Sequence, residues 1–319
     1  MRFHLSSEFN DAISAAADYF KIREAYIEKD YWVTYVLNNL SNSKLKDKVV
    51  FKGGTSLSKV HKCIERFSED NDLAIIEDEG MGDSKRKNLM KEIEATVSQG
   101  LIEIKDHPQT EKRGKNRKTF YKYPEAVEKK NMGLVKDVIQ LEINSFTKPD
   151  PYSKMQVESL ISQYLRENNF ADKIELNNLR PFEIIVLSIE RTFFEKILSL
   201  IRLSYENIET LRSKIKHFYD IVKILKYNKT ILDNENSFEI LKNAFNDDNT
   251  NSTFSGDWLN KPISEAPLFT NFENLWESLD SVYKNDLKDL IWTDIMPSNN
   301  EVKESIMKIR EFVVRFQNK

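Results

Sequence analysis

The sequence has few of the residue types that hold a disulfide or a zinc ion. Its 319 residues include one cysteine, Cys63, and four histidines at positions 4, 61, 107 and 217. A single cysteine excludes an internal disulfide, and the histidines never fall into the spacing of a zinc site. We therefore expect neither a disulfide scaffold nor a zinc enzyme.

Long apolar runs and a strong excess of one charge are also missing. No stretch approaches the roughly 20 apolar residues that span a membrane, and residues 1–8 lack the apolar core of a signal peptide. The net charge of −3 gives no general attraction for nucleic acid, so a polyanion would have to bind a local basic patch. We expect a cytoplasmic protein of one large or two modest domains, with no membrane partner.

Glycine is scarce, which draws attention to the one adjacent pair. The chain has eight glycines, five of them between positions 53 and 100, and the pair is Gly53-Gly54. Such a pair suits a position where the backbone takes a positive φ or approaches something closely, such as a phosphate. An ordinary turn between a strand and a helix is the simpler explanation on the glycines alone.

Hydrophobic periodicity divides the chain into an α/β part and a helical part. Two helices are expected before residue 48. The strands expected after it are 49–51, 72–76, 101–105, 119–123 and 137–146, with helices at 55–63 and 84–99. After Pro149 and Pro151 the composition shifts toward long helices, including 190–203 and 208–225, although 182–187 could add a strand. The pattern predicts an α/β (α+β) domain at 1–150 and a mainly helical domain at 151–319.

Two aspartates stand one residue apart at the start of an expected strand. Because side chains alternate along a strand, Asp70 and Asp72 project to the same side and can hold a hard divalent cation. The glycine turn supplies backbone N–H groups and the hydroxyls of Thr55 and Ser56, which together form a concave anion site. Each half of the site also has an ordinary explanation. The aspartates could lie in a solvated acidic loop, and the glycines could form a plain turn.

In combination, several segments resemble the AbiEii/AbiGii toxin family of nucleotidyltransferases, from about residue 24 to 226. The matching segments are Ile27-Glu28-Lys29-Asp30-Tyr31-Trp32, Phe51-Lys52-Gly53-Gly54-Thr55-Ser56-Leu57-Ser58-Lys59-Val60, Arg66-Phe67-Ser68-Glu69-Asp70, Glu190-Arg191-Thr192-Phe193-Phe194-Glu195-Lys196-Ile197-Leu198 and Lys216-His217-Phe218-Tyr219-Asp220-Ile221. The resemblance implies a nucleotidyltransferase-like mixed sheet with helices, followed by a helical C-terminal domain that contributes Lys196 and Asp220 to the site.

The resemblance also implies roles for individual residues. Asp70 and Asp72 are expected to be catalytic and to bind the metal, and Asp220 is expected to be catalytic. The expected nucleotide-binding residues are Gly53, Gly54, Thr55, Ser56, Arg66, Ser68 and Lys196. From the residues alone, Lys196 would pair with a carboxylate or reach solvent, and Asp220 would form a surface pair with Lys216. Arg66 and Ser68 serve equally well as braces of the loop.

A third carboxylate is expected on a neighbouring strand. Alternation places Gln140, Glu142 and Asn144 on one face of that strand, and Glu142 is the best-placed catalytic candidate, although a solvated face explains it nearly as well. Asn71 replaces the apolar residue usual in the family. We expect it on the face away from the metal, where either burial is reduced or Asn71 has hydrogen-bond partners.

A basic segment offers a place for an RNA acceptor. Its cations are Lys112, Arg113, Lys115, Arg117 and Lys118, and Lys85-Arg86-Lys87 is a second short run. Such a segment is usually a solvated loop, but beside a nucleotide site it could bind RNA phosphates. Tyr121 and Tyr123 follow it and could stack an unpaired base.

These observations predict a nucleotidyltransferase that uses Mg²⁺ or Mn²⁺ and acts as the toxin of a bacterial toxin–antitoxin or phage-defence pair. A nucleoside triphosphate would be the substrate, a tRNA 3′ end the acceptor, and a cognate antitoxin the partner. Two alternatives stay open: modification of a protein hydroxyl, such as one on the antitoxin, and a non-catalytic module that binds nucleotide or protein.

Overall fold

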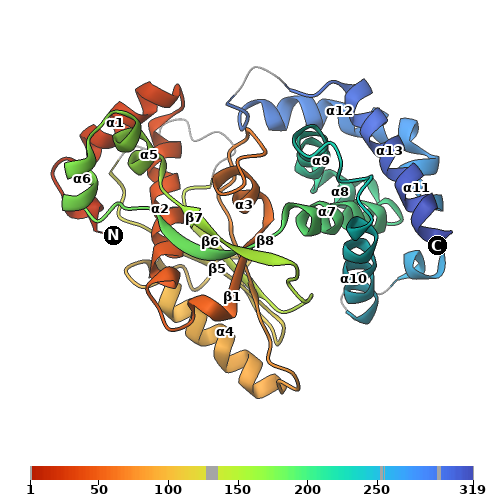
Figure 1. Ribbon diagram of the computed structural model, residues 1–319, viewed down its shortest axis with the longest axis horizontal. Helices are drawn as coiled ribbons and strands as arrows, with labels where there is room; N and C mark the ends of the chain where they lie inside the picture. The colour runs from red at the N-terminus through yellow and green to blue at the C-terminus, as the bar shows by residue number, and fades with distance from the viewer. Residues whose placement is uncertain (1, 127–135, 252–253, 255, 293–295, 319) are drawn as a thin grey trace. The chain divides into compact units, whose positions relative to one another are not determined.

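A computed structural model describes residues 2–126, 136–251, 254, 256–292 and 296–318 of the chain (Figure 1). The described chain divides into two compact units. The first contains Met1–His61 and Phe67–Leu187, and the second contains Lys62–Arg66 and Ser188–Lys319. The boundary expected at residue 150 therefore falls after Leu187, because the residues between these two positions add strands and helices to the first unit.

The first unit is built on a mixed sheet of eight strands among the described residues. The strand order is β3-β5-β6-β2-β1-β8-β7, with β4 paired to β5. The strands are β1 Val49–Lys52, β2 Asn71–Ile75, β3 Ile102–Glu103, β4 Glu111–Lys112, β5 Asn116–Lys122, β6 Ile139–Asn144, β7 Tyr152–Val157 and β8 Phe182–Leu187. Pairs β1–β8 and β2–β6 are parallel, whereas β1–β2 and β5–β6 are antiparallel. The mixed sheet confirms the predicted fold class, and β8 confirms the extra strand at 182–187.

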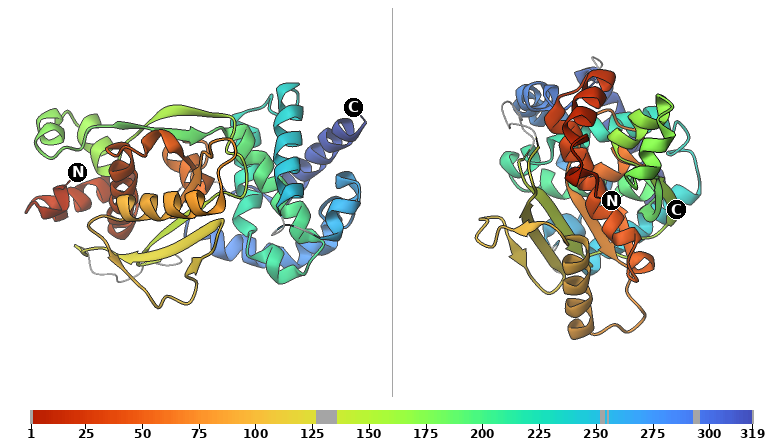
Figure 2. Two further views of the ribbon diagram at one scale, coloured as in Figure 1. Left: turned by 90° about the horizontal axis from the view of Figure 1, so that it is seen from below. Right: turned by 90° about the vertical axis from the view of Figure 1, so that its left-hand side faces the viewer.

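The described part of the first unit contains six α-helices. They are α1 Phe9–Phe20, α2 Glu24–Ser41, α3 Gly53–Lys59, α4 Asp83–Val97, α5 Leu160–Glu167 and α6 Ala171–Leu176. Helix α2 packs against α1, α4, α5 and the sheet, and it is therefore apolar on most of its circumference. Figures 1 and 2 show α1, α5 and α6 grouped beside α2.

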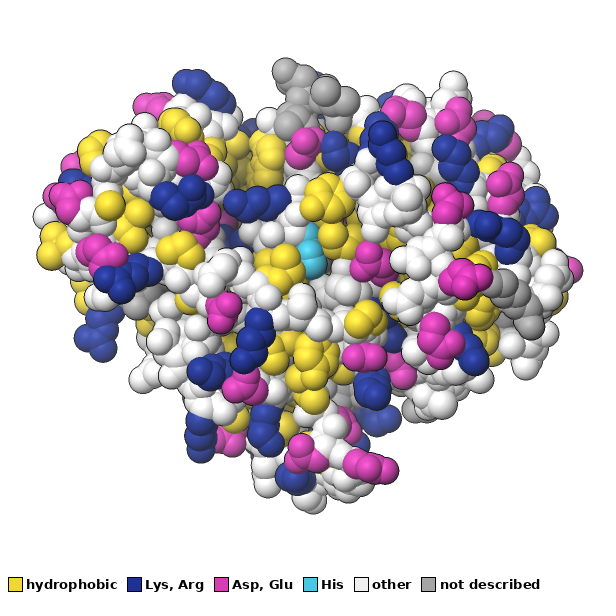
Figure 3. Space-filling model, viewed as in Figure 1, with side chains coloured by type: hydrophobic (Ala, Val, Ile, Leu, Met, Phe, Trp, Pro, Cys, Tyr) yellow, Lys and Arg dark blue, Asp and Glu magenta, His cyan; other side chains and the backbone are white. Residues whose placement is uncertain are grey.

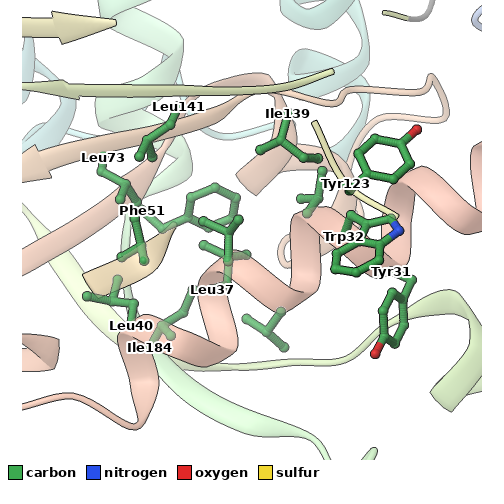
Figure 4. Packing of buried hydrophobic residues seen from close by; sticks show 14 of the residues in the cluster. Tyr31, Trp32, Leu37, Leu40, Phe51, Leu73, Tyr123, Ile139, Leu141 and Ile184 are labelled. Atoms are coloured by element: carbon green, nitrogen blue, oxygen red, sulfur yellow. The ribbon is translucent and has the colours of Figure 1, made fainter. Parts of the chain in front are cut away.

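The core of the first unit lies between α2 and the sheet. Figure 4 shows Leu37 and Leu40 of α2 close to Phe51, Leu73 and Leu141 of three adjacent strands, and all five are almost completely buried. Because side chains alternate along a strand, the residues between these positions project from the opposite face. The sheet thus has one apolar face under α2, and its opposite face carries a smaller apolar cluster of Val50, Ile185 and Leu187 as well as polar positions.

Strand β7 was not expected from the sequence. It forms the edge of the sheet and pairs with β8 residue for residue, from Tyr152 opposite Leu187 to Val157 opposite Phe182. Most of its side chains are exposed, so the strand lacks the apolar alternation that marks a half-buried strand. Its position at an edge explains why hydrophobic periodicity missed it.

The described part of the second unit is helical, as predicted. Its longer helices are α7 Ile189–Ser204, α9 Ile215–Tyr227, α10 Asn236–Thr250, α12 Phe272–Lys288 and α13 Asn299–Gln317, with the short helices α8 Ile208–Arg212 and α11 Pro267–Thr270. The helix expected at 208–225 is split into α8 and α9. Helix α7 packs on α9 and α10, and α9 packs on α12 and α13. No helix in the described residues is long and apolar enough to cross a membrane.

Candidate active site

The turn between β1 and α3 requires glycine at position 53. Gly53 has φ +78°, in the left-handed region that residues with a side chain rarely adopt. A Cβ added to Gly53 would also lie only 2.1 Å from Oδ2 of Asp72. The missing side chain therefore leaves the space that the Asp72 carboxylate occupies above the turn. The glycine turn and Asp72, one residue of the predicted acidic pair, do come together.

Two alanine substitutions separate the need for a positive φ from the need for space beside Asp72. We expect Gly53→Ala and Gly80→Ala each to lose about 1 to 2 kcal/mol of unfolding free energy, because both glycines have positive φ. Only Gly53→Ala is expected to reduce activity strongly, since an added Cβ at Gly80 meets nothing within 4 Å. Urea unfolding and nucleotidyl-transfer rates test this expectation. Equal activity of the two variants would show that the close contact with Asp72 is unimportant.

The hydroxyls of Thr55 and Ser56 are turned into the protein. Ser56 donates to the carbonyl oxygen of Gly53 at 2.9 Å, and Thr55 donates to Oγ of Ser68 at 3.0 Å. Both residues are buried and their hydroxyls hold the turn, so nucleotide binding by Thr55 and Ser56 stays a prediction. Ser68 is half-buried and accepts this bond, which leaves its own hydroxyl hydrogen for a further acceptor. Phosphate binding by Ser68 stays a prediction.

Glu142 is the direct neighbour of Asp72 in the sheet. Asp72 of β2 is in register with Glu142 of β6 on one side and with Lys52 of β1 on the other. Lys118 of β5 stands opposite Glu142. Neighbouring strands are about 4.8 Å apart, and residues in register project to the same face. The row therefore sets two carboxylates side by side between two cations, on the face opposite α2.

Asp70 and Asn71 lead into β2 at some cost in stability. Asp70 is partly exposed, yet its Oδ1 is buried and has no hydrogen-bond partner among the described residues. Asn71 is fully buried, and within the described chain neither atom of its amide has a partner. The expectation of reduced burial or hydrogen-bond partners is wrong for Asn71, because β2 is a central strand. An unpaired buried amide costs about 1 to 3 kcal/mol.

The acidic residues fit a hard divalent cation in part. In the described part of the chain, no three His, Cys, Asp or Glu side chains converge into a complete metal site. Mg²⁺, however, is usually held by one or two carboxylates together with water and substrate phosphates. Among the described residues Oδ1 of Asp70 has no partner, and it is a suitable ligand because a cation would compensate the cost of its burial. Asp70 and Asp72 are therefore the residues that would hold the metal.

Asp220 of α9 is the centre of a buried ion cluster in the second unit. Nε and Nη2 of Arg66 donate to its two carboxylate oxygens at 2.7 and 2.8 Å, and Nζ of Lys196 in α7 lies 2.9 Å from Oδ2. All three residues are buried. Burial alone would raise the pKa of Asp220, but Arg66 and Lys196 outweigh burial and hold the pKa well below its usual value. Asp220 is a carboxylate that orients two cations.

These contacts change the interpretation of three predicted site residues. The surface pair considered for Asp220 is wrong, because the residue is fully buried and its carboxylate is bound by Arg66 and Lys196. Arg66 acts as a brace, and Lys196 pairs with a carboxylate. Nucleotide binding by Arg66 and Lys196 stays a prediction, in which Asp220 positions the two cations and does not itself touch the nucleotide.

Most of the basic segment is engaged within the first unit. Arg117 is buried in an ion pair with Glu94 of α4, and Lys112 pairs with Glu103. The hydroxyl of Tyr121 donates to Glu94 at 3.1 Å. Tyr121 and Tyr123 are buried, at 3% and 5% exposure, so the expectation that they stack a base is wrong. Both belong to the face of the sheet that α2 and α4 cover.

Three consecutive charges in α2, Glu28, Lys29 and Asp30, have no role that the sequence alone indicates. Asp30 accepts a hydrogen bond from the backbone N–H of Leu160 at 2.7 Å and pairs with Lys59 of α3. Glu28 and Lys29 are buried against other segments of the first unit. A signal was present, because three charges inside an apolar stretch of helix cannot all reach solvent.

An aspartate beside a glycine turn, on a mixed sheet, agrees with the arrangement expected for a nucleotidyltransferase. The family model "Nucleotidyl transferase AbiEii toxin, Type IV TA system" matches residues 35–298, which is more than half of the chain. The protein therefore belongs to the AbiEii family of nucleotidyltransferase toxins of type IV toxin–antitoxin systems. The family implies a nucleoside triphosphate substrate and an antitoxin partner.

Comparison with solved structures gives a distant likeness. The chain is similar to "MenT4, nucleotidyltransferase toxin Rv2826c from Mycobacterium tuberculosis H37Rv", with 13% sequence identity and a TM-score of 0.39 over 92% of this chain and 98% of that one. This likeness is too weak to carry an argument about function. A comparison with curated proteins found no match.

Proposed function

We propose that the protein transfers a nucleoside monophosphate from a nucleoside triphosphate to the 3′ end of tRNA in the cytoplasm. The observation that supports this proposal best is the Asp72 carboxylate above the Gly53 turn and in register with Glu142. In the reaction, the acceptor hydroxyl oxygen forms a bond to the α-phosphorus, the bond from that phosphorus to the β-phosphate breaks, and pyrophosphate leaves. Growth would stop because the modified tRNA no longer supports translation.

Each residue of the site has a proposed task. Asp70 and Asp72 would hold Mg²⁺ or Mn²⁺, and the bound metal supplies positive charge to the α-phosphate and the leaving group. Glu142 would accept the proton of the attacking hydroxyl. Lys196, oriented by Asp220, would bind the triphosphate as a point charge. Backbone N–H groups at the Gly53 turn would contact phosphate oxygens.

Transfer of label is the direct test. The purified protein is incubated with each nucleoside triphosphate labelled on the α-phosphate, with total tRNA, and with Mg²⁺ or EDTA. We expect label to enter tRNA from at least one nucleotide in the presence of Mg²⁺, and we expect no transfer from the same nucleotide labelled on the γ-phosphate. Label on protein instead would support the protein-hydroxyl acceptor. No metal-dependent transfer to tRNA or to added protein would support the non-catalytic binding module.

The acceptor RNA has a smaller set of candidate contacts than the sequence suggested. Arg113 and Lys115 are exposed in the loop between β4 and β5, and exposed Lys87 lies beside Gly114 of that loop. We call Lys87, Arg113 and Lys115 the loop cations. Figure 3 shows Lys and Arg side chains mixed with Asp and Glu over the visible face.

Neutralising the loop cations is expected to weaken RNA binding selectively. The triple alanine variant of Lys87, Arg113 and Lys115 should raise the apparent KM for tRNA about tenfold and reduce the slope of log K against log salt by at most about 2. The KM for the nucleotide should not change. A triple alanine variant of Lys21, Lys44 and Lys154, exposed cations of the same unit, is the control for net charge. An equal rise in the KM for tRNA in the two variants would show that RNA does not bind at the loop cations.

A further inference from the structure

Lys29 of α2 is a fully buried lysine whose ammonium group has a complete set of acceptors. Its Nζ donates to the carbonyl oxygen of Lys136 at 2.8 Å and to the carbonyl oxygen of Val138. The same atom lies 3.2 Å from Oε2 of Glu69. An ammonium has three N–H donors, and these three acceptors match that number. The geometry suits a charged lysine in a fixed orientation.

Glu69 completes the link from the other side. It is buried, and its two carboxylate oxygens accept the backbone N–H of Lys136 at 3.1 and 3.0 Å. Lys29 and Glu69 therefore bind the same short segment, residues 136–138. Lys29 donates to two carbonyl oxygens of this segment, and Glu69 accepts one of its backbone N–H groups. Three segments distant in sequence are joined here by hydrogen bonds with charged groups, which are stronger than neutral ones.

The segments joined by this link are those that lead into the two acidic strands. Glu69 immediately precedes Asp70, which leads into β2, and Val138 immediately precedes β6, which carries Glu142. Strands β2 and β6 are parallel neighbours, and Asp72 is in register with Glu142. The link therefore lies where both strands begin, and it fixes the backbone from which the acidic residues project.

Charge supports the same connection. Burial holds the pKa of Lys29 below its usual value, although the negative charges of Glu69 and Asp70 oppose this shift. The Lys29 ammonium thus interacts with the Asp70 carboxylate as well as with Glu69.

We propose that Lys29 and Glu69 are positioning residues that hold Asp70 in place for metal binding. Neither residue touches the metal or the nucleotide. The inference rests on the proposed function, because it assumes that Asp70 and Asp72 bind the metal. It also gives a role to Lys29, one of the three consecutive charges in α2. The sequence alone indicated no role for these charges.

The test measures metal binding directly, without turnover. Free Mn²⁺ is followed by electron paramagnetic resonance in the absence of nucleotide, for the full-length wild type, Glu69→Gln, and the double variant Lys29→Met with Glu69→Gln. The double variant removes both charges, so no unpaired charge is left buried if Glu69→Gln alone fails to fold. Glu94→Gln is the matched control, because it breaks the buried ion pair with Arg117 in the same unit. Asp72→Asn identifies the proposed metal site.

We expect Glu69→Gln and the double variant to raise the Kd for Mn²⁺ about 10- to 100-fold, as loss of groups that orient metal ligands does. Glu94→Gln should keep the wild-type Kd although its Tm falls by a similar amount. Wild-type affinity in both Glu69 variants, with binding lost in Asp72→Asn, would overturn the positioning role and leave the proposed function intact. An equal rise in the Kd of Glu94→Gln for Mn²⁺ would also overturn the positioning role. Unchanged Mn²⁺ binding and transfer in Asp72→Asn would overturn the proposed function and this inference together.

Discussion

Asp70→Asn and Asp72→Asn are each expected to reduce nucleotidyl transfer on the order of 100- to 1000-fold while the protein stays folded. Each substitution removes a negative charge that would hold the metal, and stabilisation of charge is the main source of catalysis in such a reaction. The fold should tolerate the change, because neither carboxylate fills the apolar core. Transfer from an α-labelled nucleotide gives the rate, and thermal unfolding gives the Tm.

The same substitutions are not expected to lower the Tm. Asp70 carries a buried oxygen that has no hydrogen-bond partner among the described residues, and Asp72 stands between the carboxylate of Glu142 and the cation of Lys52, whose effects oppose each other. Glu183→Gln, an exposed position on β8 of the same sheet, is the control for loss of one charge. Full activity in both aspartate variants would contradict the two-carboxylate metal site.

Growth provides a physiological form of this prediction. Expressed alone in a bacterium, the wild type should slow growth, and Asp72→Asn at equal abundance should not, because toxicity is assigned to the reaction. A protein with a net charge of −3 is poorly suited to poison a cell by coating nucleic acid. Equal toxicity of the inactive variant would favour the binding module. The absence of toxicity in the wild type would mean that these growth conditions do not expose the activity.

Asp220→Asn is expected to lose about 3 to 5 kcal/mol of unfolding free energy, the largest effect on stability that we predict. The substitution leaves Arg66 and Lys196 buried beside a neutral group, so two cations lose their partner. Urea unfolding of the two proteins at pH 7 measures the difference. Glu209→Gln, which breaks an exposed pair with Arg212, should cost less than about 1 kcal/mol.

The contribution of Asp220 should depend on pH in one direction. Its pKa is depressed in the folded state, so the stability that it provides is fully present above the unfolded pKa of about 3.9 and is lost as the pH falls toward the folded value. The difference between wild type and Asp220→Asn should therefore be constant from pH 7 to 5 and shrink below about pH 4. A difference that grows on acidification would contradict the ion cluster as its cause.

Lys196→Met helps to separate binding from stability. Asp220 keeps its two bonds to Arg66 in this variant, so the loss of stability should be smaller than in Asp220→Asn. If Lys196 binds the triphosphate, the KM for the nucleotide should rise more than the loss of stability explains. Normal kinetics with a large fall in Tm would show that Lys196 is only a structural partner of Asp220.

The sequence by itself determined the parts of the site that are encoded locally. Gly53 and the Asp70–Asp72 pair lie in short segments whose geometry follows from one turn and one strand. The face that carries Glu142 followed from alternation along β6, because Ile139, Leu141 and Ile143 all lie in the core. The strands and helices with strong apolar periodicity were found for the same reason.

Only the tertiary structure decided which residues are partners. The pairing of Arg66 and Lys196 with Asp220 joins positions far apart in the chain, and local periodicity contains no information on such contacts. The same holds for the link from Lys29 to Glu69. Without these partners, a buried lysine looks like a surface lysine in the sequence.

Tertiary packing also decided where apparent surface groups lie. Arg117 belongs to a basic run that resembles a loop, but β5 carries it against α4, where Glu94 compensates its charge. Tyr123 alternates as a base-stacking residue would, yet its ring lies against Trp32 of α2. The pattern of one segment gives the face on which a side chain lies, whereas the segment that packs on that face sets its burial and its partners.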